Sequence, residues 1–173
     1  MDESINREEI ARDMKQLISF TVGSEEYGLE LLRVKEVIRM RQVIWLPKAP
    51  ACVKGIINLR GVVIPIVDLR ERFRLAAAEY TPMTRVIVVE VDGKPVGMVV
   101  DSATQVVRVP ADQFEPPPAV MGEGSRDFIT AIGKMGDTLI IMIDVDMILS
   151  SEEMGRISGS LETAQEDLAL SKA

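Results

Sequence analysis

The sequence contains no histidine and a single cysteine, Cys52. Without histidine the chain cannot assemble a Ser-His or Cys-His catalytic pair, and a zinc site built from His and Cys ligands is excluded as well. One cysteine cannot form a disulfide within the chain, which fits a reducing compartment. Ala51 and Val53 flank Cys52, so we expect a packed apolar residue and not a nucleophile.

Aromatic residues are scarce, at 4%, and no apolar run approaches the roughly 18–20 residues that a membrane-spanning helix needs. The charged N-terminus lacks the apolar core of a signal peptide. The net charge of -7 argues against a nucleic-acid-binding protein, which needs a basic surface, although a local basic patch stays possible. We therefore expect a soluble, cytoplasmic protein that neither inserts into a membrane nor binds nucleic acid.

What the sequence does contain is a series of short Val- and Ile-rich segments separated by Gly, Pro, Asp or Ser. This pattern is typical of many short strands joined by turns, and it predicts a mostly β fold of the barrel or sandwich type. The clearest segments are LISFTV, RQVIWL, VVIPIV, TRVIVVEV, VGMVV, TQVVRV and DTLIIMIDV. Residues 1–15 lack this texture and are expected to form a flexible arm.

An internal repeat organises these segments. Shifted by about 69 positions, Leu17–Arg39 aligns with Val86–Arg108 without a gap, and Gly28 then matches Gly97. A shift of about 76 positions aligns Val62–Phe73 with Thr138–Leu149 and Asp68 with Asp144. The repeat predicts two related β-modules.

We therefore predict two packed, small, five-stranded β-barrels, a first over about residues 16–76 and a second over about 82–150. The boundary is expected near residues 75–84, although a strand could cross it, and a groove is expected between the barrels. Ser150 followed by Glu153 is a helix-capping pattern, which predicts a short C-terminal helix and tail over residues 151–173.

The repeat also separates structural residues from functional ones. Asp68 and Asp144 occupy matching strand ends, which indicates a turn-capping role and argues against a catalytic carboxylate pair. Trp45 aligns with Phe114 and is expected in the core. Arg60 aligns with Gly136, so no structural symmetry requires a cation there.

The segment LLRVKEVIR, from Leu31 to Arg39, has more aliphatic residues than one buried strand face requires. Such a surplus can mark an exposed binding patch, and core packing alone explains it equally well. The segment KGIINLRGVVIPIVDLR, from Lys54 to Arg70, places Arg60 between two apolar runs. These two segments are the candidate functional region.

Together with VGMVVDSATQVVRVPADQFEPPP and LIIMIDVDMILSSEEM, these two segments make the chain resemble the CheW family of chemotaxis coupling proteins from about Gln16 to Met154. The resemblance implies two packed five-stranded barrels, no enzymatic activity and no cofactor. It also implies an adaptor role between the cytoplasmic tips of chemoreceptors and the regulatory domain of the histidine kinase CheA. Recruitment to membrane-associated receptor arrays follows from that role.

Carried over by motif, the resemblance assigns partner binding to Leu31, Val34, Glu36, Val37 and Arg60. By the repeat, Val99 and Val100 are equivalent to Glu30 and Leu31, so they are expected to form the other wall of the groove. Gly55 and Gly61 bracket the Arg60 motif and are expected to fix the backbone shape.

Two other functional classes are weighed against the adaptor. A small-ligand-binding β-barrel would use the groove as its pocket, but a chain with so few aromatic residues is poorly suited to stack a ligand. A hydrolase would need Asp68 and Asp144 to act together, which their separate modules disfavour.

Overall fold

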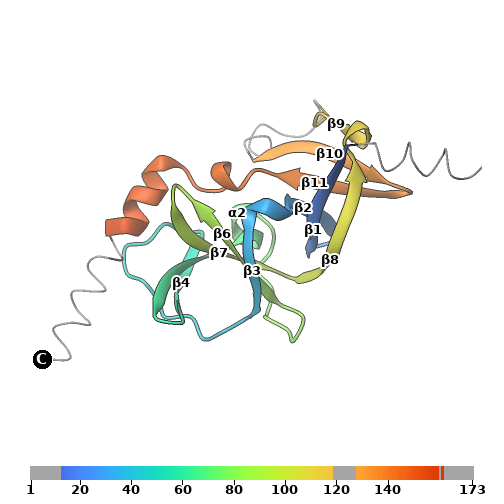
Figure 1. The fold of residues 1–173 in the computed structure, drawn as a ribbon. Coiled ribbons are helices and arrows are strands. Elements are labelled where there is room, and N and C mark those ends of the chain that lie inside the picture. Colours follow the sequence, from blue (N-terminus) through green and yellow to red (C-terminus); the bar gives the residue numbers. More distant parts are fainter. Residues whose placement is uncertain (1–12, 119–127, 160, 162–173) are drawn as a thin grey trace, which may run out of the picture.

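The computed structural model describes residues 13–118, 128–159 and 161. Most of the expected N-terminal arm, residues 1–12, and most of the C-terminal tail lie outside these residues. The end of the expected arm is not an arm, because Met14 and Lys15 belong to the first strand, β1 (Met14–Val22). Two β-sheets lie side by side, with a helix over residues 151–159 beside one of them (Figure 1). Among the described residues, no helix is long and apolar enough to cross a membrane.

The six-stranded sheet has the order β8-β1-β2-β11-β10-β9. Neighbouring strands in this sheet are antiparallel, except that β11 runs parallel to β2. This parallel pair joins the N-terminal hairpin to the C-terminal strands. Its strands are β1 (Met14–Val22), β2 (Glu25–Glu30), β8 (Ser102–Pro110), β9 (Phe114–Glu115), β10 (Ile129–Met135) and β11 (Thr138–Ile143).

The five-stranded sheet has the order β3-β6-β7-β5-β4, again antiparallel except for one parallel pair, β5 beside β7. Its strands are β3 (Val34–Arg39), β4 (Val53–Leu59), β5 (Val62–Asp68), β6 (Arg85–Val91) and β7 (Lys94–Val100). The mostly β prediction is confirmed. Barrel closure is not: the pairings among the described residues leave β3 and β4 as the edges of one sheet, and β8 and β9 as the edges of the other.

The structure supports the internal repeat. The 69-residue shift carries β2 onto β7, and the 76-residue shift carries β4 onto β10 with identical bounds. Applied to the whole strand order, the two shifts convert β8-β1-β2-β11-β10 into β3-β6-β7-β5-β4, the order of the five-stranded sheet. The two sheets are therefore two copies of one strand arrangement.

The sheets do not, however, follow the two consecutive segments that the sequence suggested. The hairpin β1–β2 joins the strands of the C-terminal half, and the hairpin β6–β7 joins β3, β4 and β5. The expected division near residues 75–84 therefore does not separate the sheets, and the strand crossing left open by the sequence occurs twice. Because each repeat gives its first hairpin to the other sheet, neither sheet can form from one repeat alone.

The matched glycines Gly28 and Gly97 explain part of the repeat. They lie at the two parallel junctions, where Gly28 is opposite Met142 and Gly97 is opposite Ile66. A Cβ atom on Gly28 would lie 2.8 Å from the Ile140 side chain, and one on Gly97 would lie 2.7 Å from the Ile66 side chain. Only glycine allows the hairpin to pack this closely against the crossing strand.

The short helical segments begin where strands end. Asp68 accepts a hydrogen bond from the Arg70 backbone N–H at 2.9 Å and caps α2 (Leu69–Arg72). Asp144 does the same with Asp146, also at 2.9 Å, at η3 (Val145–Met147). The structural role predicted for both aspartates is confirmed.

The helix over residues 151–159 also begins with the predicted capping box. The Glu153 backbone N–H donates to Ser150 Oγ at 3.1 Å, and the Ser150 backbone N–H donates to Glu153 Oε1 at 2.9 Å. Met154 and Ile157 bury their side chains in the largest core cluster, which contains residues from both sheets. The helix therefore docks on the body of the protein.

Candidate partner-binding surface

The hairpin between β4 and β5 presents Arg60 at its tip. Arg60 and Gly61 both have positive φ angles, 51° and 85°, as a two-residue type I′ turn requires. Asn58 Oδ1 accepts a hydrogen bond from the Gly61 backbone N–H at 2.8 Å. A Cβ on Gly61 would meet no atom within 4 Å, so the turn requires glycine there for its conformation and not for space.

Arg60 forms a two-pronged ion pair with Glu36 on β3, the strand at the opposite edge of the same sheet in hydrogen-bonding order. Its Nη1 and Nη2 atoms lie 2.9 and 3.0 Å from the two carboxylate oxygens. The hydrogen bond from Arg60 lowers the pKa of the Glu36 carboxyl, and the nearby charge of Arg41 acts in the same direction. The Arg60 side chain nevertheless stays 72% exposed, so the pair lies open to solvent.

Side chains of strand β3 alternate between a half-buried face and an exposed face. Glu36 and Val34 are half-buried, and Val34 packs against the main core. Val37 is exposed on the opposite face from Glu36. The structure thus brings Glu36 together with Arg60 and places Val37 on a different side of the strand.

The turn before β3 exposes a second feature, Leu32, which was not among the predicted partner-binding residues. In η1 (Leu31–Arg33), Leu31 packs against the core, whereas Leu32 is 97% exposed. A hollow of about 260 Å³ lies beside it, lined by Met14, Lys15, Gln16, Glu30, Leu31 and Leu32. The surplus of aliphatic residues noted in this segment was the available signal, because it supplies both a core contact and an exposed apolar group.

Arg33 connects this turn to η3 (Val145–Met147), the short helical turn that follows β11. Its Nη1 and Nη2 atoms donate to the Asp146 carboxylate at 2.9 and 2.6 Å, and Nη2 also donates to the Glu90 carbonyl at 3.1 Å. The hydrogen bond from Arg33 lowers the pKa of Asp146. The exposed Leu32 is therefore held on a braced turn.

Comparison with known proteins gives the family. A model of the CheW-like domain matches residues 16–153. This chain belongs to the CheW-like family. The protein "Chemotaxis protein CheW" of Klebsiella aerogenes is 36% identical over 143 residues, covering 83% of this chain and 86% of the relative. Its namesake in Treponema pallidum is 31% identical over 149 residues, with the same coverage.

A solved relative shows the same fold. The crystal structure of the scaffolding protein TtCheW from Thermoanaerobacter tengcongensis is 32% identical to this chain, with a TM-score of 0.75. The match covers 82% of this chain and 96% of that chain. Family, chemotaxis context and scaffold class therefore agree with the resemblance found in the sequence.

Two residues expected on the surface of this CheW-like domain are buried. Val99 is 4% exposed and Val100 is 1% exposed, and the two belong to different core clusters. The repeat equates them with Glu30 and Leu31, but β2 ends at Glu30 and leaves the sheet through η1, whereas β7 continues to Val100. Val99 and Val100 therefore stabilise the core and form no groove wall.

Gly55 shapes the backbone as expected, and the structure shows how. It has a φ of 151°, and a Cβ there would lie 2.1 Å from the Ile44 carbonyl oxygen. Two backbone hydrogen bonds of 2.8 Å join Ile44 to Ile56 at this point. Glycine at position 55 therefore lets the connection between β3 and β4 lie against the outer edge of β4.

The prediction that Trp45 is buried is wrong. Trp45 is 74% exposed, and its segment, RQVIWL, forms only the single bridge at Ile44 instead of a strand. The equivalent Phe114 does pack, because Gly133 lies directly beneath its ring. The five-stranded sheet has Ile57 at the position that matches Gly133, so its side chain leaves no space for an aromatic ring to pack there.

Cys52 is buried as expected, with its Sγ 3.5 Å from Glu153 Oε2. Burial raises the pKa of the thiol to about 12, and the Glu153 carboxylate adds to the rise. A thiol with this pKa is not a nucleophile near neutral pH. Among the described residues, no group of His, Cys, Asp and Glu could hold a metal ion.

Proposed function

We propose that this chain is a non-enzymatic adaptor that couples the cytoplasmic tips of chemoreceptors to the histidine kinase CheA and helps to assemble receptor arrays. Membership of the CheW-like family and the scaffold name of a solved relative support this role. The adaptor would work in the cytoplasm and be recruited to the membrane-associated arrays by its partners.

The observation that carries the proposal is the exposed ion pair between Arg60 and Glu36. Solvent-exposed ion pairs contribute little to stability, so the fold does not require a rigid two-pronged pair at a hairpin tip. Charged groups at an interface do determine register and partner choice. Arg60 retains free N–H donors for a partner's acceptor, because a guanidinium carries five and two are directed at Glu36.

Apolar contact would come from the η1 turn and from β3. Leu32 and the adjacent hollow beside Leu31 offer a site for an apolar side chain of a partner, and Val37 adds a further exposed aliphatic group. Buried apolar anchors surrounded by polar groups supply most of the binding energy in protein interfaces. The exposed ion pair would therefore supply specificity, and the apolar turn would supply most of the affinity.

The mechanism is thermodynamic. An adaptor changes kinase output only if it binds one arrangement of receptor and kinase more tightly than another. The two sheets share core residues and exchange hairpins, which makes the domain a stiff spacer between its binding surfaces. A stiff spacer transmits a preference of one partner to the other without chemistry of its own.

The direct test mixes the purified chain with soluble receptor tips and CheA kinase and measures complex formation and kinase autophosphorylation. We expect a ternary complex by size-exclusion chromatography and a change in kinase rate that requires all three components. Failure to bind either partner would overturn the adaptor role. Saturable binding of a small metabolite to the chain alone would favour the ligand-binding alternative.

A further inference from the structure

A basic strip of the sequence runs from β3 to β5 in this acidic protein. Residues 37–67 contain five basic residues and no acidic one, whereas the whole chain carries a net charge of -7. The five basic residues are Arg39, Arg41, Lys48, Lys54 and Arg60. Such a strip attracts negatively charged partners that the rest of the surface repels.

Most of this charge is not neutralised within the fold. Lys54 is paired with Glu71 at 2.6 Å, and Arg60 is paired with Glu36. In the part of the chain that the structure describes, no ion pair involves Arg39, Arg41 or Lys48. Arg39 even lies opposite Arg85 in the register of β3 and β6, an unfavourable pairing of like charges.

The same region presents apolar side chains on an open backbone edge. Ile44 and Trp45 are 58% and 74% exposed. Ile44 uses both of its backbone groups to pair with Ile56 of β4, so the backbone groups of Val43 and Trp45 are directed away from β4. Within the described ranges, neither Val43 nor Trp45 forms a hydrogen bond to another backbone group.

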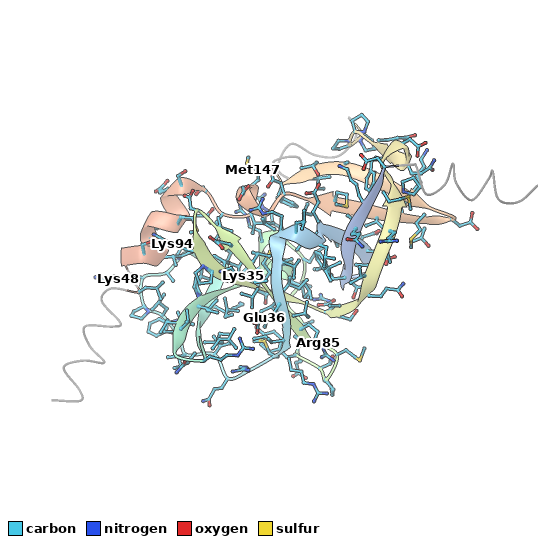
Figure 2. The ribbon with its side chains drawn as sticks, in the orientation of Figure 1. Lys35, Glu36, Lys48, Arg85, Lys94 and Met147 are labelled. Atoms are coloured by element: carbon cyan, nitrogen blue, oxygen red, sulfur yellow. The ribbon has the colours of Figure 1, made fainter. Side chains whose placement is uncertain are left out.

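The Arg41 side chain and the open backbone edge both lie along the outer side of β4. Arg41 Nη1 lies 3.5 Å from the carbonyl oxygen of Asn58, which is two residues beyond Ile56 on β4. Residues two apart direct their backbone groups to the same side of a strand, so Arg41 follows the outer edge of β4 beside Ile44. Lys48 lies farther along this connection between β3 and β4 (Figure 2).

We propose that residues 41–48 form a second docking site, adjacent to the Arg60–Glu36 surface, for an acidic segment of a partner protein. The segment would pair in extended form with the open edge at Val43 and Trp45, as an added strand. Its carboxylates would face Arg41 and Lys48, and its apolar side chains would cover Trp45. A lipid headgroup could use the charge but not the backbone edge, so the edge favours a polypeptide.

Trp45 is the only tryptophan of the chain and therefore reports directly on this site. The probe is the acetylated and amidated peptide (Val-Glu)4, titrated into the full chain with tryptophan emission as the readout. We expect a saturable blue shift. The peptide (Val-Lys)4 and a (Val-Glu)4 peptide with alternate backbone nitrogens methylated should each bind at least about tenfold more weakly.

The variants sharpen the test. Arg41→Glu and, separately, Lys48→Glu should each weaken peptide binding about tenfold while retaining the far-ultraviolet circular dichroism of the parent. Arg108→Glu is the control for a charge reversal outside the site, because Arg108 is an exposed arginine on the other sheet, and it should bind like the parent.

Several results would overturn the proposal. They are the absence of any peptide-induced shift, equal binding of the methylated peptide, and unchanged binding by both Glu variants. A shift produced only by phosphatidylglycerol-containing vesicles would assign the surface to lipid, and one that follows protein concentration without peptide would assign it to self-association. Each of these outcomes leaves the adaptor role of the Arg60–Glu36 surface standing, since that role is tested with receptor and kinase.

Discussion

The two sheets share one strand arrangement, yet they treat equivalent positions differently. In the six-stranded sheet the outer edge is covered by β9, with Phe114 packed over Gly133, and the β10–β11 turn carries Gly136. In the five-stranded sheet the equivalent aromatic residue, Trp45, is exposed, and the equivalent turn carries Arg60. The repeat therefore preserves the framework, while the residues that depart from it lie on one sheet, where we propose that partners bind.

A second difference lies where the chain passes between the sheets. At the crossing from β7 to β8, Arg70 of α2 donates to Asp101 at 2.9 and 2.6 Å. At the crossing from β2 to β3, Asp146 of η3 accepts from Arg33 at the same two distances. Arg70 and Asp146 are repeat equivalents, so the two crossings use the same brace with the charges reversed.

Gly55→Ala should produce the largest difference in stability between equivalent positions of the two sheets. Its Cβ would collide with the Ile44 carbonyl, a backbone atom that cannot rotate away, so we expect a loss of about 3 kcal/mol in the free energy of unfolding. The matched residue in the other sheet, Ala131, already carries a Cβ, and Ala131→Gly should cost only about 0.5–1 kcal/mol. Urea titration of both variants checks this, and equal losses would contradict the role given to Gly55.

The two capping aspartates should give a smaller and nearly symmetric effect. Asp68→Ala and Asp144→Ala each remove the acceptor for one backbone N–H, which costs about 1 kcal/mol at a helix start. Asp68 is the more buried of the two, so its variant should lose more. Asparagine at either position should restore most of the urea midpoint, and a failure to do so would argue against capping.

The two arginine–aspartate ion pairs at the crossings should contribute differently to the loss of stability at low pH. Hydrogen bonds from Arg70 and Arg33 lower the pKa values of Asp101 and Asp146 from the ordinary 3.8. The stabilisation is therefore complete well above pH 4 and is lost as the pH falls through the lowered folded-state values. Asp101→Asn should flatten the decline in urea midpoint below pH 4 more than Asp146→Asn, because the Asp101 side chain is less exposed. Parallel acid profiles for the parent and both variants would contradict these braces.

Much of the framework could be predicted from the sequence, because aligning the two copies of the repeat shows which residues are structurally equivalent. The equivalence of Gly28 with Gly97, and of Asp68 with Asp144, follows from alignment alone, and the structure gives each pair one physical role. Sheet membership could not be predicted this way. A hairpin with the same apolar pattern fits either copy of the sheet, and the sequence does not show which copy it joins.

The site was predicted less completely, and the failures share a cause. Burial of Val99 and Val100 and exposure of Trp45 depend on where a strand leaves the sheet and on what lies beneath a ring. Equivalent positions in a repeat do not share these surroundings. Arg60 was singled out because it lacked an equivalent cation, and that reasoning led to the exposed ion pair with Glu36.

In the role that we propose, Arg60 and Glu36 serve a partner and not the fold. The most direct measurement compares Arg60→Asp and Glu36→Lys with the parent in two assays: urea unfolding, and receptor-dependent CheA phosphorylation. We predict an unchanged urea midpoint and at least about a tenfold loss of coupling for each variant. Variants that unfold early, or that couple like the parent, would contradict the claim.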